Sequence, residues 1–215
     1  MNSKLQTNQL NEQLVNRANI YKLLADCFKY PEDSLEDTLK LLKSATVSYD
    51  DVMGTSAEKL VDNFKVNTFL KELQIEYSRL FVGPFQLDAP PYSSVYLDKQ
   101  GLVMGESTQQ AIEFYVKAGL DPALEIHEPP DHIRVELEFM YFLLFRKVMD
   151  KNNQFLDISY EFMEKHLTHW VFTFTNKIKD CTESKFYIRL AELLDSFLSK
   201  EKELIFKHLK NKNTV

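Results

Sequence analysis

Glycine and proline, the two residues that interrupt helices, are confined almost entirely to the middle of this chain. Four of the five glycines lie between residues 83 and 119, and six of the seven prolines lie between residues 84 and 130. On both sides of that region, apolar residues recur at spacings of three and four, which is the period of an amphipathic helix. A length of 215 residues suits one domain, so we predict an all-α, single-domain helical bundle over residues 1–215.

The central glycines and prolines predict two irregular connections, a long loop at about 83–105 and a second loop at about 119–130. A connection of about twenty residues is long for a compact domain. Loops that are held by a rigid scaffold often carry function. We therefore expect the functional site in these two loops.

Polar residues in front of apolar runs predict where several helices begin. Ser34, Thr55 and Ser107 each precede such a run, with a carboxylate or amide residue three positions later, as in a capping box. Asp131 follows a proline and is predicted to cap the helix that runs to about residue 148.

The composition narrows the classes of function. A formal net charge of −6 argues against nucleic acid as a partner and permits a basic peptide or protein. The longest wholly apolar run, residues 139–145, is far short of the roughly 20 residues that a membrane-spanning helix needs. The N-terminus lacks the apolar core of a secretory signal. Because Cys27 and Cys181 also stand alone, we expect a cytoplasmic protein without disulfides.

Sequence motifs of the common enzyme classes are missing. The chain has no phosphate-binding P-loop, no dinucleotide-binding Gly-x-Gly-x-x-Gly and no zinc-binding His-Glu-x-x-His. It also lacks the Glu-x-x-His pair of di-iron bundles and the Gly-x-Ser-x-Gly elbow of hydrolases. We therefore predict a binding protein without catalytic residues, metal or cofactor.

The first candidate segment spans residues 77–97. Its sequence predicts a helix that stops at Gly83 and Pro84, followed by a run dense in proline and aromatic residues. Proline holds the backbone extended and presents neighbouring rings at low entropic cost, which favours a rigid apolar groove for a peptide. The alternative, which composition alone favours, is a proline-stiffened loop that packs on its own core. The residues concerned are Phe85, Pro90, Pro91, Tyr92 and Tyr96.

The second candidate segment, residues 125–138, contains one arginine and, when Asp121 just upstream is counted, six carboxylates. Three interpretations stay open: a solvated acidic helix start, a metal site made by Asp131, His132 and Glu136, and an acidic anchor for a basic partner. Carboxylates bind guanidinium groups through charge-assisted, often bidentate, hydrogen bonds. His166 and His169 have a spacing that also permits metal binding, although histidines in a core or on a surface are far commoner.

In their order and spacing, these segments resemble the TorD/DmsD family of redox-enzyme maturation chaperones. The family is all-helical, in agreement with the helical pattern on both sides, so the resemblance covers most of the chain while its motifs fill the middle. Position 92 is Tyr where some members carry Trp, which leaves the detail of the pocket open. The matching residues are Tyr77, Leu80, Phe81, Gly83, Pro84, Ala89, Pro90, Pro91, Tyr92, Ser94, Val95, Tyr96, Gly101, Gly119, Leu120, Glu128, Pro129, Pro130, Asp131, His132, Glu136, Leu137 and Met140.

The resemblance implies a chaperone. Family members bind the twin-arginine signal peptide of a molybdenum-cofactor oxidoreductase, contact its core, hold the apoenzyme until cofactor is inserted and delay its export. Dimethyl sulfoxide, trimethylamine N-oxide and related reductases all stay open as the client, and a monomer or a helix-exchanged dimer is expected. The implied signal-peptide surface is Leu80, Phe81, Pro91, Tyr92, Asp131 and His132, with Tyr77, Gly83, Pro84, Ser94, Tyr96, Glu128 and Glu136 as supports.

Residue chemistry fits such a leader, in which two arginines precede an apolar stretch. The acidic region around Asp131 suits the arginine pair, and the aromatic and proline groove suits the apolar part. His132 is expected to make leader binding sensitive to pH near neutrality. The alternatives are a nucleotide-dependent switch, a helical metal-binding enzyme, and a structural subunit of an oxidoreductase complex.

Overall fold

The computed structural model describes residues 2–67, 70–83, 87–121 and 128–212. Helices make up most of these residues and no strand occurs among them, which confirms the all-α prediction. The elements in chain order are α1 (Asn2–Cys27), α2 (Leu35–Tyr49), α3 (Asp51–Asn67), α4 (Leu70–Tyr77), a π-helical turn η1 (Ser78–Val82), α5 (Ser93–Leu97), α6 (Glu106–Lys117), α8 (Ile133–Asp150), α9 (Asn153–Phe162), a second π-helical turn η2 (Met163–Leu167), α10 (Thr168–Cys181) and α11 (Lys185–Lys212).

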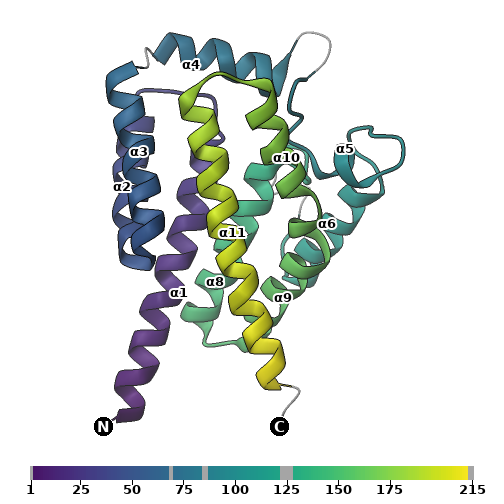
Figure 1. The fold of residues 1–215 in the computed structure, drawn as a ribbon. Coiled ribbons are helices and arrows are strands. Elements are labelled where there is room, and N and C mark those ends of the chain that lie inside the picture. Colours follow the sequence, from purple (N-terminus) through teal and green to yellow (C-terminus); the bar gives the residue numbers. More distant parts are fainter. Residues whose placement is uncertain (1, 68–69, 84–86, 122–127, 213–215) are drawn as a thin grey trace.

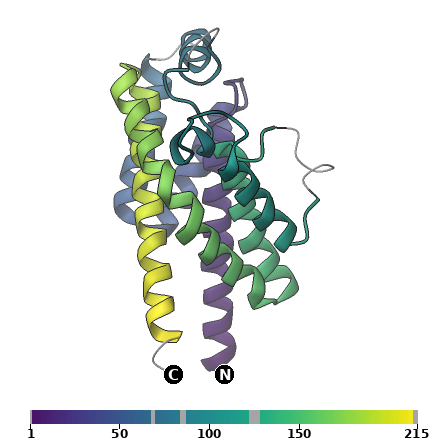
Figure 2. The ribbon, with the colours of Figure 1, turned by 90° about the vertical axis from the view of Figure 1, so that its right-hand side faces the viewer.

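The long helices form a bundle in which segments distant in sequence lie side by side. Helix α1 packs against α2 and α8, and α11 packs against α3 and α10. Both ends of the described chain lie at one end of the bundle, and α4 lies across the other end (Figure 1; Figure 2 gives the perpendicular view). No helix in the described ranges is long and apolar enough to cross a membrane.

Aromatic residues fill much of the core beneath the first candidate segment. The Phe81 ring lies 5.2–6.2 Å, centroid to centroid, from the rings of Phe28, Tyr77, Phe174 and Tyr187. These separations are those of favourable edge-to-face or tilted aromatic pairs. The end of α4 and the turn η1 are therefore fixed to the residue that follows α1, to α10 and to α11.

A buried carboxylate ties three helices together. The Glu201 side chain of α11 accepts two hydrogen bonds from Arg17 of α1, at 2.7 and 2.8 Å. It also accepts hydrogen bonds from the hydroxyl groups of Tyr21, at 3.1 Å, and of Tyr49 on α2, at 2.8 Å. Four donors around one fully buried carboxylate compensate for its removal from water.

The predicted helix starts are partly wrong. Ser34 does precede α2, but its side chain makes no capping bond. Thr55 lies inside α3, because the Asp50 carboxylate caps that helix one turn earlier by accepting the N–H groups of residues 52 and 53. At α6 the Asp98 carboxylate, nine residues upstream, accepts the N–H of Ser107. At α6 a carboxylate from outside the local sequence thus replaces the expected capping box, whereas at α3 the cap is the residue directly before the helix.

Candidate functional site

The two candidate segments meet face to face. Tyr92 and His132, forty residues apart in sequence, form an isolated antiparallel bridge. The residues on either side of this pair exchange backbone hydrogen bonds of 2.9 and 2.8 Å. The two side-chain rings pack edge to face, with centroids 5.3 Å apart. The Pro91–Tyr92 and Asp131–His132 parts of the predicted surface are therefore one structural unit.

Asp131 is not the solvated helix cap that the sequence predicts. Its side chain is fully buried, and Oδ2 accepts the backbone N–H of Ser94 at 3.1 Å and the Ser94 hydroxyl at 2.5 Å. Its other oxygen, Oδ1, makes no hydrogen bond to a described residue. Asp131 thus fixes α5 and the end of the long loop onto the start of α8. The carboxylate is turned away from solvent.

His132 takes the capping role instead. Its Nδ1 accepts the backbone N–H of Arg134 at 3.1 Å and so caps α8. Burial and then the nearby Arg134 charge lower the pKa of His132 to about 3. The imidazole is therefore neutral between pH 6 and 8, with its proton on Nε2. The expectation that His132 titrates near neutrality is wrong for the unbound protein.

Glu136 lies one turn further along α8 and is also fully buried. Its two oxygens contact His166 Nε2 at 2.8 Å and accept the indole N–H of Trp170 at 2.9 Å. Burial alone would lower the pKa of His166, but the Glu136 carboxylate outweighs it, so the pKa is raised. Asp131, His132 and Glu136 therefore have separate partners. Within the described ranges, no group of three His, Cys, Asp or Glu side chains could hold a metal ion.

The remaining predicted residues lie mostly below the surface. Leu80 and Phe81 are buried in the aromatic core. Tyr77 donates its hydroxyl to the Phe28 carbonyl at 3.2 Å, and Tyr96 stacks on Trp170 with centroids 5.7 Å apart. Pro91 is buried, Tyr92 is half-buried, and Gly83 ends η1 at a φ of 46°, which favours glycine. Pro84 lies outside the described residues.

A cleft of about 520 Å³ opens beside the Tyr92–His132 bridge, between the α1–α2 connection and the start of α8. Glu128 and Arg134 line one part of it, with the Arg134 Nε and a Glu128 oxygen 2.9 Å apart. Tyr30 and Tyr77 line another part as an edge-to-face pair with centroids 5.5 Å apart. The cleft therefore combines aromatic rings with three carboxylates, one guanidinium and one ammonium group, which belong to Asp26, Glu32, Glu128, Arg134 and Lys29.

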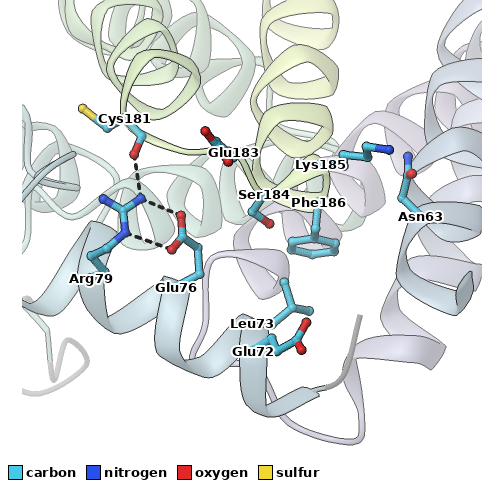
Figure 3. A pocket seen from close by; sticks show the side chains of 10 residues that line it. All are labelled: Asn63, Glu72, Leu73, Glu76, Arg79, Cys181, Glu183, Ser184, Lys185 and Phe186. Atoms are coloured by element: carbon cyan, nitrogen blue, oxygen red, sulfur yellow. Dashed lines mark hydrogen bonds and ion pairs between the residues drawn. The ribbon is translucent and has the colours of Figure 1, made fainter. Parts of the chain in front are cut away.

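Arg79 anchors the long loop to the bundle. Its guanidinium donates to both Glu76 oxygens at 2.6 and 2.9 Å and to the Cys181 carbonyl at 2.6 Å (Figure 3). It also pairs with Asp88 in the loop. This cluster borders a second cavity of about 770 Å³. One arginine thus connects η1, the loop before Tyr92 and the end of α10.

Sequence reasoning missed several residues that shape the site. The pairing of Arg79 with Asp88 joins residues nine apart across a loop, and no periodic pattern marks it. Tyr30 stands in the α1–α2 connection, where it appears as an ordinary residue before Pro31. Arg134 had a usable signal, because it is the one cation among the six carboxylates of residues 121–138.

Comparison with known proteins supports the class that this fold and site define. The crystal structure described as that of a redox enzyme maturation protein from Archaeoglobus fulgidus aligns with a TM-score of 0.56 and 25% identity, over 85% of this chain and 93% of that one. A family model described as nitrate reductase delta subunit matches residues 48–176. The fold is thus shared with proteins of redox-enzyme maturation.

Relatives named chaperone protein TorD give the family more narrowly. The protein from Shewanella pealeana is 30% identical over 87% of this chain and 88% of its own. The protein from Aliivibrio salmonicida is 26% identical over 89% and 95%. The protein from Shewanella piezotolerans is 32% identical, and that alignment spans 62% of each chain. The chain belongs to the TorD/DmsD family of redox-enzyme maturation chaperones.

Proposed function

We propose that this protein is a cytoplasmic chaperone that binds the twin-arginine signal peptide and the apo-form of a molybdenum-cofactor oxidoreductase. In this role it assists cofactor insertion and delays export. The observation that carries the proposal is the Tyr92–His132 bridge, which joins the two segments that match the family, beside an open cleft. The names of the TorD relatives support a chaperone role.

The chemistry of the site supports a peptide ligand with a cation and an apolar stretch. A charge-assisted hydrogen bond to a cleft carboxylate contributes about 1.5–3 kcal/mol. Apolar side chains that cover the half-buried Tyr92 ring add about 25 cal/mol per Å² of buried area. Because Leu80 and Phe81 are buried, they do not contact the peptide in this proposal. They support the site by holding Tyr77 and η1 in place.

The test is a calorimetric titration with twin-arginine leader peptides of the molybdoenzymes encoded in the same genome. Binding of one leader at micromolar or lower Kd, lost when its arginine pair is replaced by alanine, is the expected result. Tyr92→Ala should weaken leader binding at least about tenfold, because the exposed part of the Tyr92 ring contributes apolar contact. Tyr141→Ala, which removes an equally half-buried tyrosine from α8, is the matched control.

Two results would count against the proposal. If no leader binds, signal-peptide recognition is refuted. If the protein remains with the finished, cofactor-loaded enzyme at one copy per enzyme through gel filtration, a structural subunit explains the site better than a chaperone.

A further inference from the structure

Glu128 is the carboxylate of the acidic segment that lies on the cleft. Asp131 and Glu136 are fully buried and accept hydrogen bonds from Ser94 and Trp170. Glu138, on another part of α8, pairs with Lys22 of α1. The Glu128 side chain is 36% exposed and lines the cleft. The Glu128 Oε2 atom that faces Arg134 is buried, so a cation that arrives from solvent reaches the exposed remainder of the Glu128 side chain, whereas Asp131 is closed to it.

Arg134 pairs with Glu128 at a position where the local electrostatics disfavour a cation. It is the second residue of α8, where the partial positive charge of the helix N-terminus opposes a cation. The contact with Glu128 is close, at 2.9 Å. However, neither the Arg134 Nε nor this Glu128 oxygen makes a well-aligned hydrogen bond to a described residue. Attraction to Glu128 explains why the guanidinium lies there, and a better-aligned guanidinium would compete with it.

The aromatic part of the cleft suits the flat face of a guanidinium, and the second cation in the lining, Lys29, is paired with Asp26 at 2.6 Å. Tyr30 is 49% exposed and packs against Tyr77, and the Tyr77 ring is fixed by its bond to the Phe28 carbonyl. Arginine stacks on aromatic rings as well as pairing with carboxylates, which lysine does less well. Glu32, also in the cleft lining, is exposed and makes no ion pair with a described residue.

We propose that this cleft is a guanidinium subsite in which Glu128 receives an arginine side chain of the client's leader, and that Arg134 fills the subsite in the unbound protein. This inference rests on the proposed function. It moves arginine recognition from Asp131 to Glu128 and makes Arg134 an internal competitor of the ligand. Removal of Arg134 should therefore strengthen leader binding, an effect that loss of a merely structural residue would not produce.

The first experiment is calorimetry with the leader that binds the wild-type protein and with the same leader carrying Gln in place of its arginines. Glu128→Gln should weaken binding of the arginine leader about tenfold or more, and Arg134→Gln should strengthen it about threefold or more. Both effects should vanish with the Gln leader. The controls are Glu138→Gln, whose side chain is 35% exposed against 36% for Glu128, and Arg146→Gln at the far end of α8. Thermal denaturation checks that each variant is folded.

The second experiment needs no leader. The protein has five arginines, so their side-chain Nε–H signals can be resolved by NMR, and the Arg134 signal is identified by its loss in Arg134→Gln. Titration with arginine amide should shift the Arg134 signal, lysine amide should shift it less, and Glu128→Gln should abolish the shift.

The two experiments separate the inference from the proposed function. If a leader binds but Glu128→Gln and Arg134→Gln change its affinity no more than the controls, the subsite is overturned and leader binding stands. If no leader binds but arginine amide shifts the Arg134 signal, the subsite stands and the proposed function fails. If neither occurs, both are wrong.

Discussion

The hydrogen bonds between Asp131 and Ser94 allow a quantitative test of what holds the long loop in place. Hydrogen bonds to charged groups contribute about 1.5–3 kcal/mol each, and Asp131 accepts two from Ser94. Removing Asp131 also relieves the desolvation of Oδ1, which is buried without a partner. We therefore expect Asp131→Ala to lower the free energy of unfolding by about 3 kcal/mol, the lower end of that sum.

The assay is urea denaturation followed by far-UV circular dichroism, on the two single variants and the double variant Asp131→Ala/Ser94→Ala. Ser94→Ala should cost about 1.5–3 kcal/mol, and the double-mutant cycle should give a coupling energy of similar size. Ser93→Ala is the matched control, because the Ser93 hydroxyl is equally buried but makes no hydrogen bond to a described residue. It should change stability by less than about 0.5 kcal/mol.

A coupling energy below about 0.5 kcal/mol would refute this account of Asp131, because independent sites add within that margin. The result also bears on how binding data are interpreted. If Asp131→Ala both destabilises the protein and weakens leader binding, the loss of binding follows from a displaced loop. Variants of Glu128 are then the cleaner probes of arginine recognition.

Four further predictions follow from buried or anchoring charges. Glu201→Gln should destabilise the protein by about 3–5 kcal/mol in urea denaturation, because it leaves a buried guanidinium uncompensated; a loss below about 1 kcal/mol would contradict the assigned role. Because the pKa of His132 is lowered to about 3, stability should fall as pH drops below about 6.5, and His132→Asn, which can still cap α8, should remove this loss. Because the pKa of His166 is raised above about 6.5, its contribution to stability should be full at lower pH and be lost as pH rises through the folded-state value; a pH profile unchanged in His166→Gln would refute this. Arg79→Gln should speed amide exchange in residues 87–92 at least about tenfold in hydrogen-exchange measurements, because it frees the loop from Glu76 and Asp88; unchanged exchange would mean that other contacts hold the loop.

The helical architecture could be predicted from the sequence because it depends on a local signal. Apolar spacing of three and four residues reports the buried face of each helix directly. Helix ends were less predictable, since they depend on which donor and acceptor groups the fold brings together. Asp98 caps α6 and Asp50 caps α3, and in both cases a carboxylate outside the expected box supplies the bond.

The candidate site shows the same limit. The two segments selected from the sequence do lie against each other, and Tyr92 and His132 are in contact. It did not reveal that Asp131 is buried against Ser94, because burial of a carboxylate depends on a partner 37 residues away. The pKa of His132 was likewise unpredictable, since it depends on tertiary desolvation.

The common location of the two chain ends has a practical consequence for how this protein can be handled. Helix α1 has 26 residues, so it separates its first residue from the Tyr30 side of the cleft by about 39 Å. The end of α11 lies at the same distant end of the bundle (Figure 1). A fluorophore, surface linker or fused domain attached at either end is therefore held away from the cleft. The protein can be immobilised through its C-terminus while a binding partner approaches the opposite end without obstruction.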